Sequence, residues 1–237
     1  MGVAVVTGAN RGIGLALVRQ LRARGMSVVD VCRRRSSDLH RLGVRIESGI
    51  DLASPEACVE PAARLAHDEI NLLIHNAGLL IEDTLSSVRA EDVRAQLEIN
   101  ALAPLFLTQA LTPLLAHGAK VALITSRMGS IGDNTSGGYY GYRMSKAALN
   151  AAGVSMARDF APRGVSVVIL HPGAVRTGMT GGQGILEPDF RGCSAERLSR
   201  LVRPAHPAAE IHAKLTQEKD EAASERPKSL SRLVGAK

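Results

Sequence analysis

The stretch Val3-Ala4-Val5-Val6-Thr7-Gly8-Ala9-Asn10-Arg11-Gly12-Ile13-Gly14 predicts how the chain begins to fold. Its apolar start is typical of a short buried strand, and three glycines mark the turn that leads into a pattern of helical period. Glycines let the backbone approach a pyrophosphate closely, and the start of a helix supplies amide donors and the positive end of its dipole. The stretch therefore predicts a phosphate-binding turn between a strand and a helix.

Short apolar runs recur along the chain, with room for a helix between them. After the first strand they lie at residues 27–32, 44–46, 70–74, 121–125 and 165–170. Helical patterns cover residues 13–24, 55–67, 90–116 and 142–161, and Pro104 and Pro113 are expected to kink or interrupt the third. The runs are continuous, as in parallel strands that are covered on both faces. We predict an α/β fold: a single doubly wound Rossmann-type domain with a parallel sheet of at least six strands and helices on both faces.

The composition agrees with one globular domain. The chain has 237 residues, of which 45% are hydrophobic and 22% charged, which excludes disorder, collagen and coiled coil. Three cysteines without a C-x-x-C pair favour neither a disulfide framework nor a zinc ribbon. The N-terminus shows no signal-peptide pattern and no apolar stretch that could span a membrane, so a cytoplasmic location is expected.

The last part of the chain differs in character from the rest. We assign residues 1–190 to the Rossmann-type domain and residues 191–237 to a basic tail that is partly helical and partly disordered. The tail carries +4 of the net charge of +6 and contains no aromatic residue, so no nucleic acid is expected as a partner. Gly178, Gly181, Gly182 and Gly184 precede it and form either a lid over a ligand site or a plain surface loop.

Further motifs follow the glycine turn in the order of one known family. They are His75-Asn76-Ala77-Gly78 after the fourth predicted strand, Asn100 within a helix, Ser126 after the fifth strand, Tyr142-x-x-x-Lys146, and Pro172-Gly173 and Thr177 after the sixth strand. Together with Thr-Gly-x-x-x-Gly-x-Gly, they make residues 1–180 resemble the short-chain dehydrogenase/reductase family. Residues 133–146 look most like its C-factor and sniffer-type carbonyl reductases. In that family a further helix and a seventh strand follow and build subunit contacts, but no such strand is visible here, so a homo-oligomer stays an open question.

The resemblance implies a dinucleotide site built from the glycine turn and from the ends of later strands. The residues that we assign to cofactor binding are Gly8, Asn10, Arg11, Gly12, Ile13, Gly14, Arg33, Asp51, Leu52, Asn76, Ala77, Gly78, Tyr142, Lys146, Pro172, Gly173 and Thr177. Asp51 and Leu52 match a pair that contacts adenine in the family, although an Asp here can instead cap the helix that begins near Ser54. His75 and His171 have no second ligand at metal spacing, and we interpret them as core or loop histidines without a metal.

The end of the second predicted strand distinguishes NADP from NAD. NAD-preferring relatives place an acidic residue where this chain has Cys32, so no carboxylate is expected to accept from the ribose hydroxyls. Arg33, which two more arginines follow, and Arg11 in the glycine turn suit a 2′-phosphate, because guanidinium groups bind phosphate through paired charge-assisted hydrogen bonds. Strand alternation places Asp30 two residues too early to compete. NADP(H) is therefore predicted, with NAD less favoured.

Reduction of a carbonyl by a nicotinamide places a hydride on carbon and a proton on oxygen, so it needs a side chain that gives up a proton near neutral pH. A free tyrosine has a pKa of about 10, and a nearby lysine ammonium lowers it. Tyr142 and Lys146 are four residues apart, so they share one face of a helix. By resemblance, Tyr142 is the general acid, Lys146 lowers its pKa and holds the nicotinamide ribose, and Ser126 hydrogen-bonds the substrate carbonyl.

Two of these assignments have alternatives. Ser130 competes with Ser126, but Ser126 ends a strand and begins a Ser-x-x-Gly pattern with Gly129. Asn100 would by resemblance hold a water of the proton relay, or it satisfies backbone groups at a helix kink near Pro104. With this set, the sequence predicts an NADP(H)-dependent reductase that converts a small ketone or aldehyde to an alcohol. The alternative is an NADP(H)-binding signalling or regulatory protein with little turnover.

Overall fold

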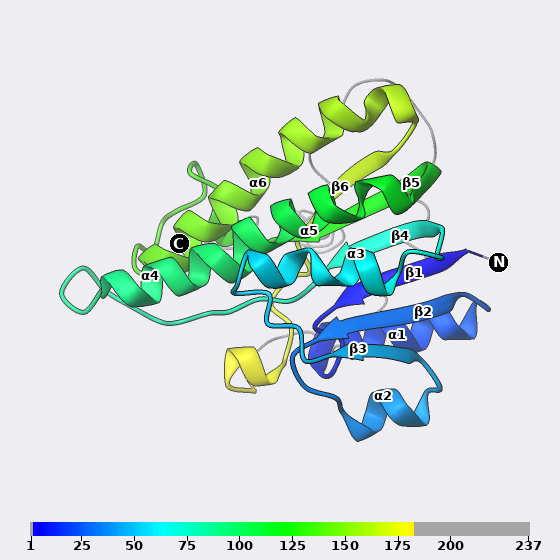
Figure 1. Ribbon diagram of the computed structural model, residues 1–237. Helices are drawn as coiled ribbons and strands as arrows, with labels where there is room; N and C mark the ends of the chain where they lie inside the picture. Colours follow the sequence, from blue (N-terminus) through cyan, green and yellow to red (C-terminus); the bar gives the residue numbers. More distant parts are fainter. Residues whose placement is uncertain (1, 183–237) are drawn as a thin grey trace, which may run out of the picture.

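The computed structural model describes residues 2–182, and these form one six-stranded parallel sheet with the order β3-β2-β1-β4-β5-β6 (Figure 1). The strands are β1 (Val3–Thr7), β2 (Ser27–Cys32), β3 (Arg45–Ser48), β4 (Ile70–His75), β5 (Leu115–Ile124) and β6 (Ser166–Leu170). All five strand pairings are parallel. The strand order reverses between β1 and β4, which opens a crevice at the carboxyl ends of these two strands. The predicted fold class and its six strands are confirmed.

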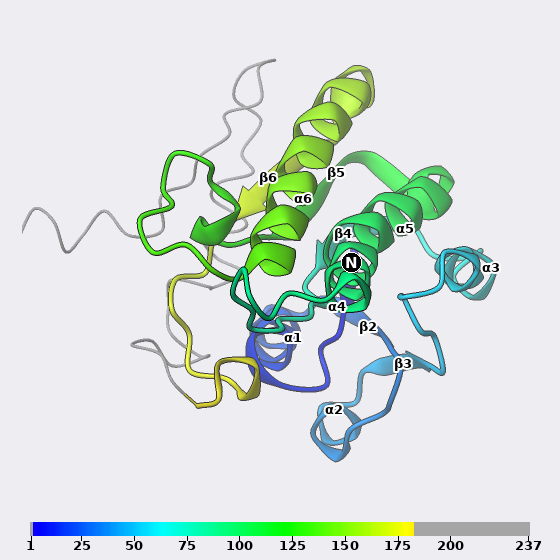
Figure 2. The same ribbon diagram turned by 90° about the vertical axis from the view of Figure 1, so that its left-hand side faces the viewer.

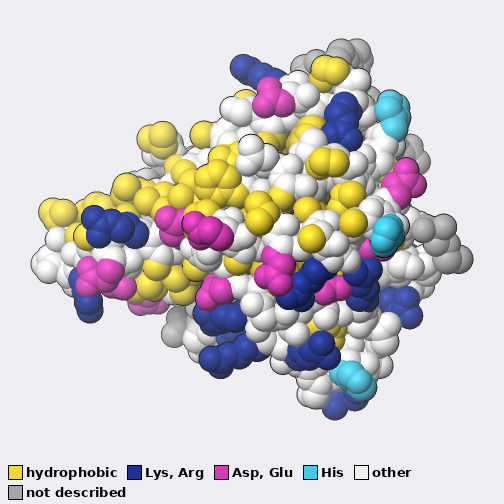
Figure 3. Space-filling model, in the orientation of Figure 1, with side chains coloured by type: hydrophobic (Ala, Val, Ile, Leu, Met, Phe, Trp, Pro, Cys, Tyr) yellow, Lys and Arg dark blue, Asp and Glu magenta, His cyan; other side chains and the backbone are white. Residues whose placement is uncertain are grey.

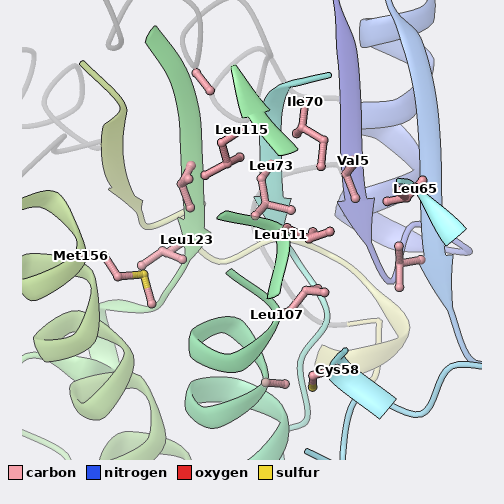
Figure 4. Close-up of a cluster of buried hydrophobic side chains, with 14 of the residues drawn as sticks. Val5, Cys58, Leu65, Ile70, Leu73, Leu107, Leu111, Leu115, Leu123 and Met156 are labelled. Atoms are coloured by element: carbon pink, nitrogen blue, oxygen red, sulfur yellow. The ribbon is translucent and has the colours of Figure 1, made fainter. Parts of the chain in front are cut away.

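Helices cover both faces of the sheet (Figure 2). They are α1 (Gly12–Ala23), α2 (Ser37–Arg41), α3 (Glu60–Arg64), α4 (Ala90–Leu97), α5 (Ala103–Leu111) and α6 (Tyr140–Phe160). Side chains alternate along β1: Ala4 and Val6 pack with α1, whereas Val5 packs with the cluster that includes α5 and α6. The cluster on the face of α5 and α6 includes Leu107 and Met156 (Figure 4). The continuous apolar strands thus supply two cores, one on each face.

The predicted helix over residues 90–116 is divided into α4, α5 and two irregular helical turns, as its prolines suggested. Between α4 and α5 lies a π-helical turn, η2 (Glu98–Leu102), and Pro104 follows directly. After α5, a 3₁₀ turn, η3 (Thr112–Leu114), contains Pro113. The predicted end at residue 116 is wrong, because β5 already begins at Leu115. A short apolar run fits a helix and a buried strand equally well, and here pairing with β4 decides for the strand.

Two shorter helical features also differ from the predictions. The predicted helix over residues 55–67 consists of a 3₁₀ turn, η1 (Glu56–Cys58), and the five-residue α3. Pro61 has no N–H to continue a helix through this point. The sequence patterns missed α2, which has five residues and is capped by Ser36, whose side chain accepts a hydrogen bond from the Leu39 amide.

Figure 3 shows the face that carries α3 to α6. Hydrophobic side chains gather along α4, α5 and α6 on this face, and Leu105 and Met144 are among the exposed ones. Within residues 2–182, no helix is both long and apolar enough to cross a bilayer. The expected tail over residues 191–237 lies outside the described residues.

Candidate active site

The glycine turn is held by hydrogen bonds and close contacts to the segment that follows β4. Gly8 and Gly12 have φ angles of +65° and +57°, which favour glycine. The Asn76 side chain donates to the Thr7 and Gly8 carbonyl oxygens, both at 3.0 Å, and Thr7 Oγ1 accepts from the Asn76 amide. A Cβ on Gly14 would lie 2.5 Å from Asn76 Nδ2 and 2.8 Å from the Gly8 oxygen. The turn therefore packs tightly against the end of β4.

Asp30 has a structural place in this turn. It is fully buried, and its Oδ1 accepts a hydrogen bond of 2.8 Å from the Ala9 amide. Burial raises the pKa of Asp30, and the bond from the Ala9 amide is among the interactions that lower it. Because this carboxylate is used inside the fold, it is not a ribose ligand.

A cavity of about 380 Å³ opens beside the turn at the carboxyl ends of the strands. The predicted cofactor residues that line it are Gly8, Asn10, Arg11, Gly12, Ile13, Arg33, Asp51, Leu52, Asn76, Ala77, Gly78, Tyr142, Lys146, Pro172 and Thr177. Gly14, Gly173, Ser126 and Asn100 do not line it. The structure thus brings residues that follow or end all six strands, together with residues of α6, to one cavity of the size of a ligand site.

Sequence reasoning missed several walls of this cavity. They are Val31, Ile50, Leu79, Ile99, Ile124, Thr125 and Met179. Most of them are apolar and carry no motif, and the only signal that could have found them is their place beside a strand end or beside a recognised motif. Gly178, which the sequence assigned to a lid or a surface loop, lines the cavity as well. Cys32 and Arg34, which the sequence placed near the cofactor, also line the cavity.

The arginines that the sequence assigned to a 2′-phosphate have different partners in the structure. Arg33 Nη1 lies 3.7 Å from Asp51 Oδ2, and both side chains are at least half exposed. Arg35 turns away and donates to Ser48 Oγ at 2.9 Å. Asp51 Oδ1 also accepts from the Ala53 amide at 3.1 Å. Arg33 and Asp51 therefore stand together at the mouth of the cavity, and Arg35 belongs to the edge of the sheet.

Tyr142 and Lys146 lie on one face of α6 and are 8% and 5% exposed. Lys146 Nζ donates to the Ile124 carbonyl oxygen at 2.8 Å and lies 5.8 Å from the centre of the Tyr142 ring. Burial lowers the pKa of Lys146 to about 8. Burial also raises the pKa of Tyr142, whereas a hydrogen bond with Ser126 acts in the opposite direction. The predicted pair thus shares one buried site with Ser126.

The two candidate serines occupy different environments. Ser126 caps a 3₁₀ turn, η4 (Arg127–Gly129), where its Oγ accepts from the Met128 amide at 3.1 Å. Ser130 is exposed, and its Oγ accepts from the Asp133 amide. Only Ser126 has the bond to Tyr142. Geometry therefore favours Ser126 over Ser130.

Asn150 holds the segment that carries Ser126. Its Oδ1 accepts from Thr125 Oγ1 at 2.7 Å, and its Nδ2 donates to the Gly129 carbonyl oxygen at 3.3 Å. Gly129 also packs directly on α6, because a Cβ there would lie 2.8 Å from the Lys146 carbonyl carbon. Ser126 is thus placed from both sides relative to Tyr142.

Asn100 is fully buried in the π-helical turn. Its Oδ1 accepts from the Leu79 amide at 2.8 Å, and its Nδ2 donates to the Leu79 carbonyl oxygen at 2.7 Å and to Ser145 Oγ at 2.9 Å. The side chain therefore joins η2, the segment after β4 and α6. Its part in a water relay stays a prediction.

The two histidines stand at the carboxyl ends of strands, His75 as the last residue of β4 and His171 directly after β6. His75 Nε2 lies 2.8 Å from Thr108 Oγ1, and burial lowers the pKa of His75 to about 3. Burial also lowers the pKa of His171. Among residues 2–182, no group of three His, Cys, Asp or Glu side chains is placed to hold a metal ion. His75 is a core residue, as the sequence suggested.

The segment after β6 also lines the cavity. Pro172 and Thr177 line it, and Gly173 has a φ angle of +81°. Thr177 and Thr180 cap a short 3₁₀ turn, η6 (Gly178–Thr180), reciprocally. Gly181 and Gly182 follow, and the remainder of the predicted glycine-rich loop lies outside the described residues.

Comparison with known proteins gives the same family as the motifs. A family model described as short chain dehydrogenase matches residues 2–184. The 1-hydroxy-2-glutathionyl-2-methyl-3-butene dehydrogenase of Rhodococcus sp. (strain AD45) is 44% identical over 182 residues, which are 76% of this chain and 80% of that protein. The C-signal protein of Myxococcus xanthus is 47% identical over 123 residues, which are 51% of this chain and 74% of that protein.

Solved structures agree with these relatives. The NADPH-bound carbonyl reductase from chicken fatty liver has a TM-score of 0.77 and 31% identity, and the match covers 86% of this chain and 91% of that chain. The carbonyl reductase Sniffer of D. melanogaster has a TM-score of 0.73 and 31% identity, with 79% and 86% covered. The predicted resemblance to C-factor and sniffer-type proteins is confirmed, and the chain belongs to the short-chain dehydrogenase family of oxidoreductases.

Proposed function

We propose that this protein is an NADP(H)-dependent oxidoreductase that reduces a ketone or an aldehyde to an alcohol, with Tyr142 as the general acid. One observation carries the proposal: the buried Tyr142 phenol, bonded to Ser126 and sharing a helix face with Lys146, stands at the same cavity as the glycine turn. The proposed proton donor and the phosphate-binding turn thus line one cavity.

The residues at the cavity fit a dinucleotide phosphate. The glycine turn leaves no room for side chains at its back, and Arg11, the residue before α1, does not cap that helix with its side chain. The helix start is therefore suited to accept a pyrophosphate. Arg33 and Arg34 at the mouth suit a 2′-phosphate, and the predicted NADP(H) agrees with the cofactor found in the chicken carbonyl reductase.

In the proposed reaction the bound nicotinamide supplies a hydride to the carbonyl carbon. Ser126 donates a hydrogen bond to the carbonyl oxygen and orients it, and Tyr142 gives its proton to the same oxygen as negative charge develops there. Because burial raises the pKa of Tyr142, the phenol is protonated at neutral pH and ready to donate. Lys146 stabilises the phenolate that remains, and the same residues run the reaction backwards when an alcohol is oxidised.

The test follows NADPH and NADH consumption with purified protein and a panel of aldehydes, ketones and quinones. Alcohols that carry a thioether are also tested, for the reverse reaction in which an alcohol is oxidised, since the Rhodococcus relative is named for such a substrate. Turnover is expected with NADPH, and Tyr142→Phe is expected to lower kcat about 10³-fold while it keeps NADPH binding. Tyr140→Phe, two residues away and partly exposed, is the matched control and is expected to retain full activity.

Similarity to the C-signal protein supports a second candidate function. In this alternative the chain binds NADP(H) and acts as a signalling or regulatory protein. Tight NADPH binding without turnover on any substrate of the panel, together with a partner that requires residues 191–237, would favour it and overturn the reductase. The cytoplasmic location stays a prediction.

A further inference from the structure

The start of α6 lacks a cap of its own. Tyr139, the residue before the helix, makes no side-chain cap, and its φ angle of +54° is the one positive value among the non-glycine residues described. The first amides of a helix need acceptors from outside the helix. These amides lie directly before Tyr142, so whatever accepts from them bears on the placement of its phenol.

The acceptor comes from a distant part of the chain. Asp83, in the segment between β4 and α4, is 8% exposed. Its carboxylate accepts from the Tyr140 amide at 2.5 Å and from the Gly141 amide at 3.3 Å. Its carbonyl oxygen accepts from the Tyr139 amide at 2.9 Å. One residue thus binds three consecutive amides at the start of α6, across 57 positions of sequence.

The segment that presents Asp83 is itself held in place. Asn100 binds both backbone groups of Leu79, and Gln96 Oε1 accepts from the Ile81 amide at 3.0 Å. Gln96 is fully buried, and a Cβ on Gly141 would lie 2.4 Å from its Nε2. The segment 79–83 is therefore a rigid bridge from η2 and α4 to the first turn of α6.

The partners of Tyr142 are anchored independently of this bridge. Ser126 is held by η4 and Asn150, and Lys146 lies one turn further into α6 and is held by Ile124. If the Asp83 carboxylate is removed, two amides of the first turn of α6 lose their acceptor, while Ser126, Lys146 and the glycine turn keep theirs. The expected result is a phenol displaced from its partners in an otherwise intact site.

We propose that Asp83 is a positioning residue that sets the place of Tyr142 by capping α6 from the segment between β4 and α4. Asp83 does not line the cavity, so it acts through the helix and not by contact with substrate or cofactor. The proposal that Asp83 positions this phenol rests on the proposed function only for its effect on kcat. Its effect on the Tyr142 phenol itself is independent of any turnover.

The chain offers a clean signal for that phenol. It contains three tyrosines and no tryptophan, and all three tyrosines lie at residues 139–142. In a background carrying Tyr139→Phe and Tyr140→Phe, tyrosinate absorbance during a pH titration therefore reports Tyr142 alone. In the parent background we expect a pKa above the ordinary value of about 10, because the phenol is buried.

The test compares Asp83→Ala and Asp83→Asn with Glu91→Ala, which removes an exposed carboxylate from the first turn of α4. Asp83→Ala is expected to lower kcat about 10- to 100-fold, to change the dissociation constant of NADPH less than about threefold, and to shift the Tyr142 titration toward the ordinary value. Asp83→Asn keeps one acceptor oxygen and the size of the side chain, and is expected to retain most of the activity. Glu91→Ala is expected to match the parent.

The outcomes separate the two proposals. An unchanged Tyr142 titration in a folded Asp83→Ala protein overturns the positioning role, and so does a loss of NADPH binding in proportion to kcat, which indicates a general structural role. If Asp83→Ala does not fold, Asp83→Ser takes its place, because the shorter side chain brings its oxygen less close to the Tyr140 and Gly141 amides. An unshifted Tyr142 titration and full kcat in a folded Asp83→Ser protein then overturn the positioning role. A shifted titration in a protein that turns over no carbonyl supports the positioning role and contradicts the reductase.

Discussion

The glycine turn before α1 and the first turn of α6 both face the cavity, but they are held in different ways. The glycine turn is fixed from the two neighbouring strands, by Asp30 in β2 and by Asn76 of the motif that follows β4. The first turn of α6 is fixed by Asp83 and Gln96, which belong to no motif and lie more than 40 positions earlier in the chain. A phosphate-binding turn needs a closely packed backbone, whereas a proton donor needs a side chain that several contacts hold in position.

Electrostatics is unfavourable in both regions. At the glycine turn the buried Asp30 accepts from the Ala9 amide, but burial still raises its pKa. At α6 the buried Lys146 has a backbone carbonyl as its partner, and burial lowers its pKa to about 8. Each region therefore carries an unfavourable buried charge that the fold tolerates, as active sites often do.

The largest expected effect concerns the stability cost of Lys146. Its pKa is about 8 in the folded protein against 10.5 for an ordinary lysine, so the unfolded chain holds its proton more tightly. Folding is opposed in full below pH 8, and this cost disappears as the pH rises from 8 to 10.5. Lys146→Met is therefore expected to raise the free energy of unfolding at pH 7 by about 3 kcal/mol and to lose activity.

Thermal and urea unfolding from pH 6 to 10 measure this difference, with Lys120→Met as the control. Lys120 lies in β5 and is only half-buried, so its replacement is expected to change stability much less. A Lys146→Met protein that is less stable than the parent at pH 7 would show that the lysine supports the fold.

A smaller effect is expected from Gly14→Ala, which acts on the glycine turn. The new Cβ would lie 2.5 Å from Asn76 Nδ2 and 2.8 Å from Ala9 Cα, and the backbone on that side has no room to move. We expect a loss of 1–3 kcal/mol in stability, about tenfold to hundredfold weaker NADPH binding, and little change in the Tyr142 titration.

Gly132→Ala is the matched control, since nothing lies within 4 Å of a Cβ there. Cofactor titration by NADPH fluorescence is the measurement. If Gly14→Ala binds NADPH as tightly as Gly132→Ala, the tight packing of the turn is not what forms the cofactor site.

The smallest effect is expected from Arg33→Ala, at the mouth of the cavity. If Arg33 binds a 2′-phosphate, its loss removes a charge-assisted hydrogen bond to NADPH that NADH does not make. NADPH is expected to bind about tenfold more weakly while NADH binding is unchanged. Arg35→Ala is the control, because its guanidinium bonds to Ser48. Equal weakening of both cofactors would instead assign Arg33 to the placement of Asp51.

Much of the fold and most of the cavity lining were predictable from sequence patterns. Continuous apolar runs identify the six strands, because a strand buried on both faces needs apolar side chains at every position. The end of the helix near residue 116 and the short α2 were not predictable, because pairing with β4 and a single cap decide them. Gly8, Tyr142 and Lys146, which line the cavity, were predicted because the roles proposed for them depend on residue type and spacing.

What the sequence determined by itself is the order of strands and helices, the glycine turn and the spacing of Tyr142 and Lys146, since each depends on neighbours within a few residues. The tertiary structure alone decided that Ser126 and not Ser130 meets Tyr142, that Asp30 is used inside the fold, and that Asp83 caps α6. These contacts join segments that are 16 to 57 positions apart. A polar side chain does not reveal its distant partner until the chain has folded around it.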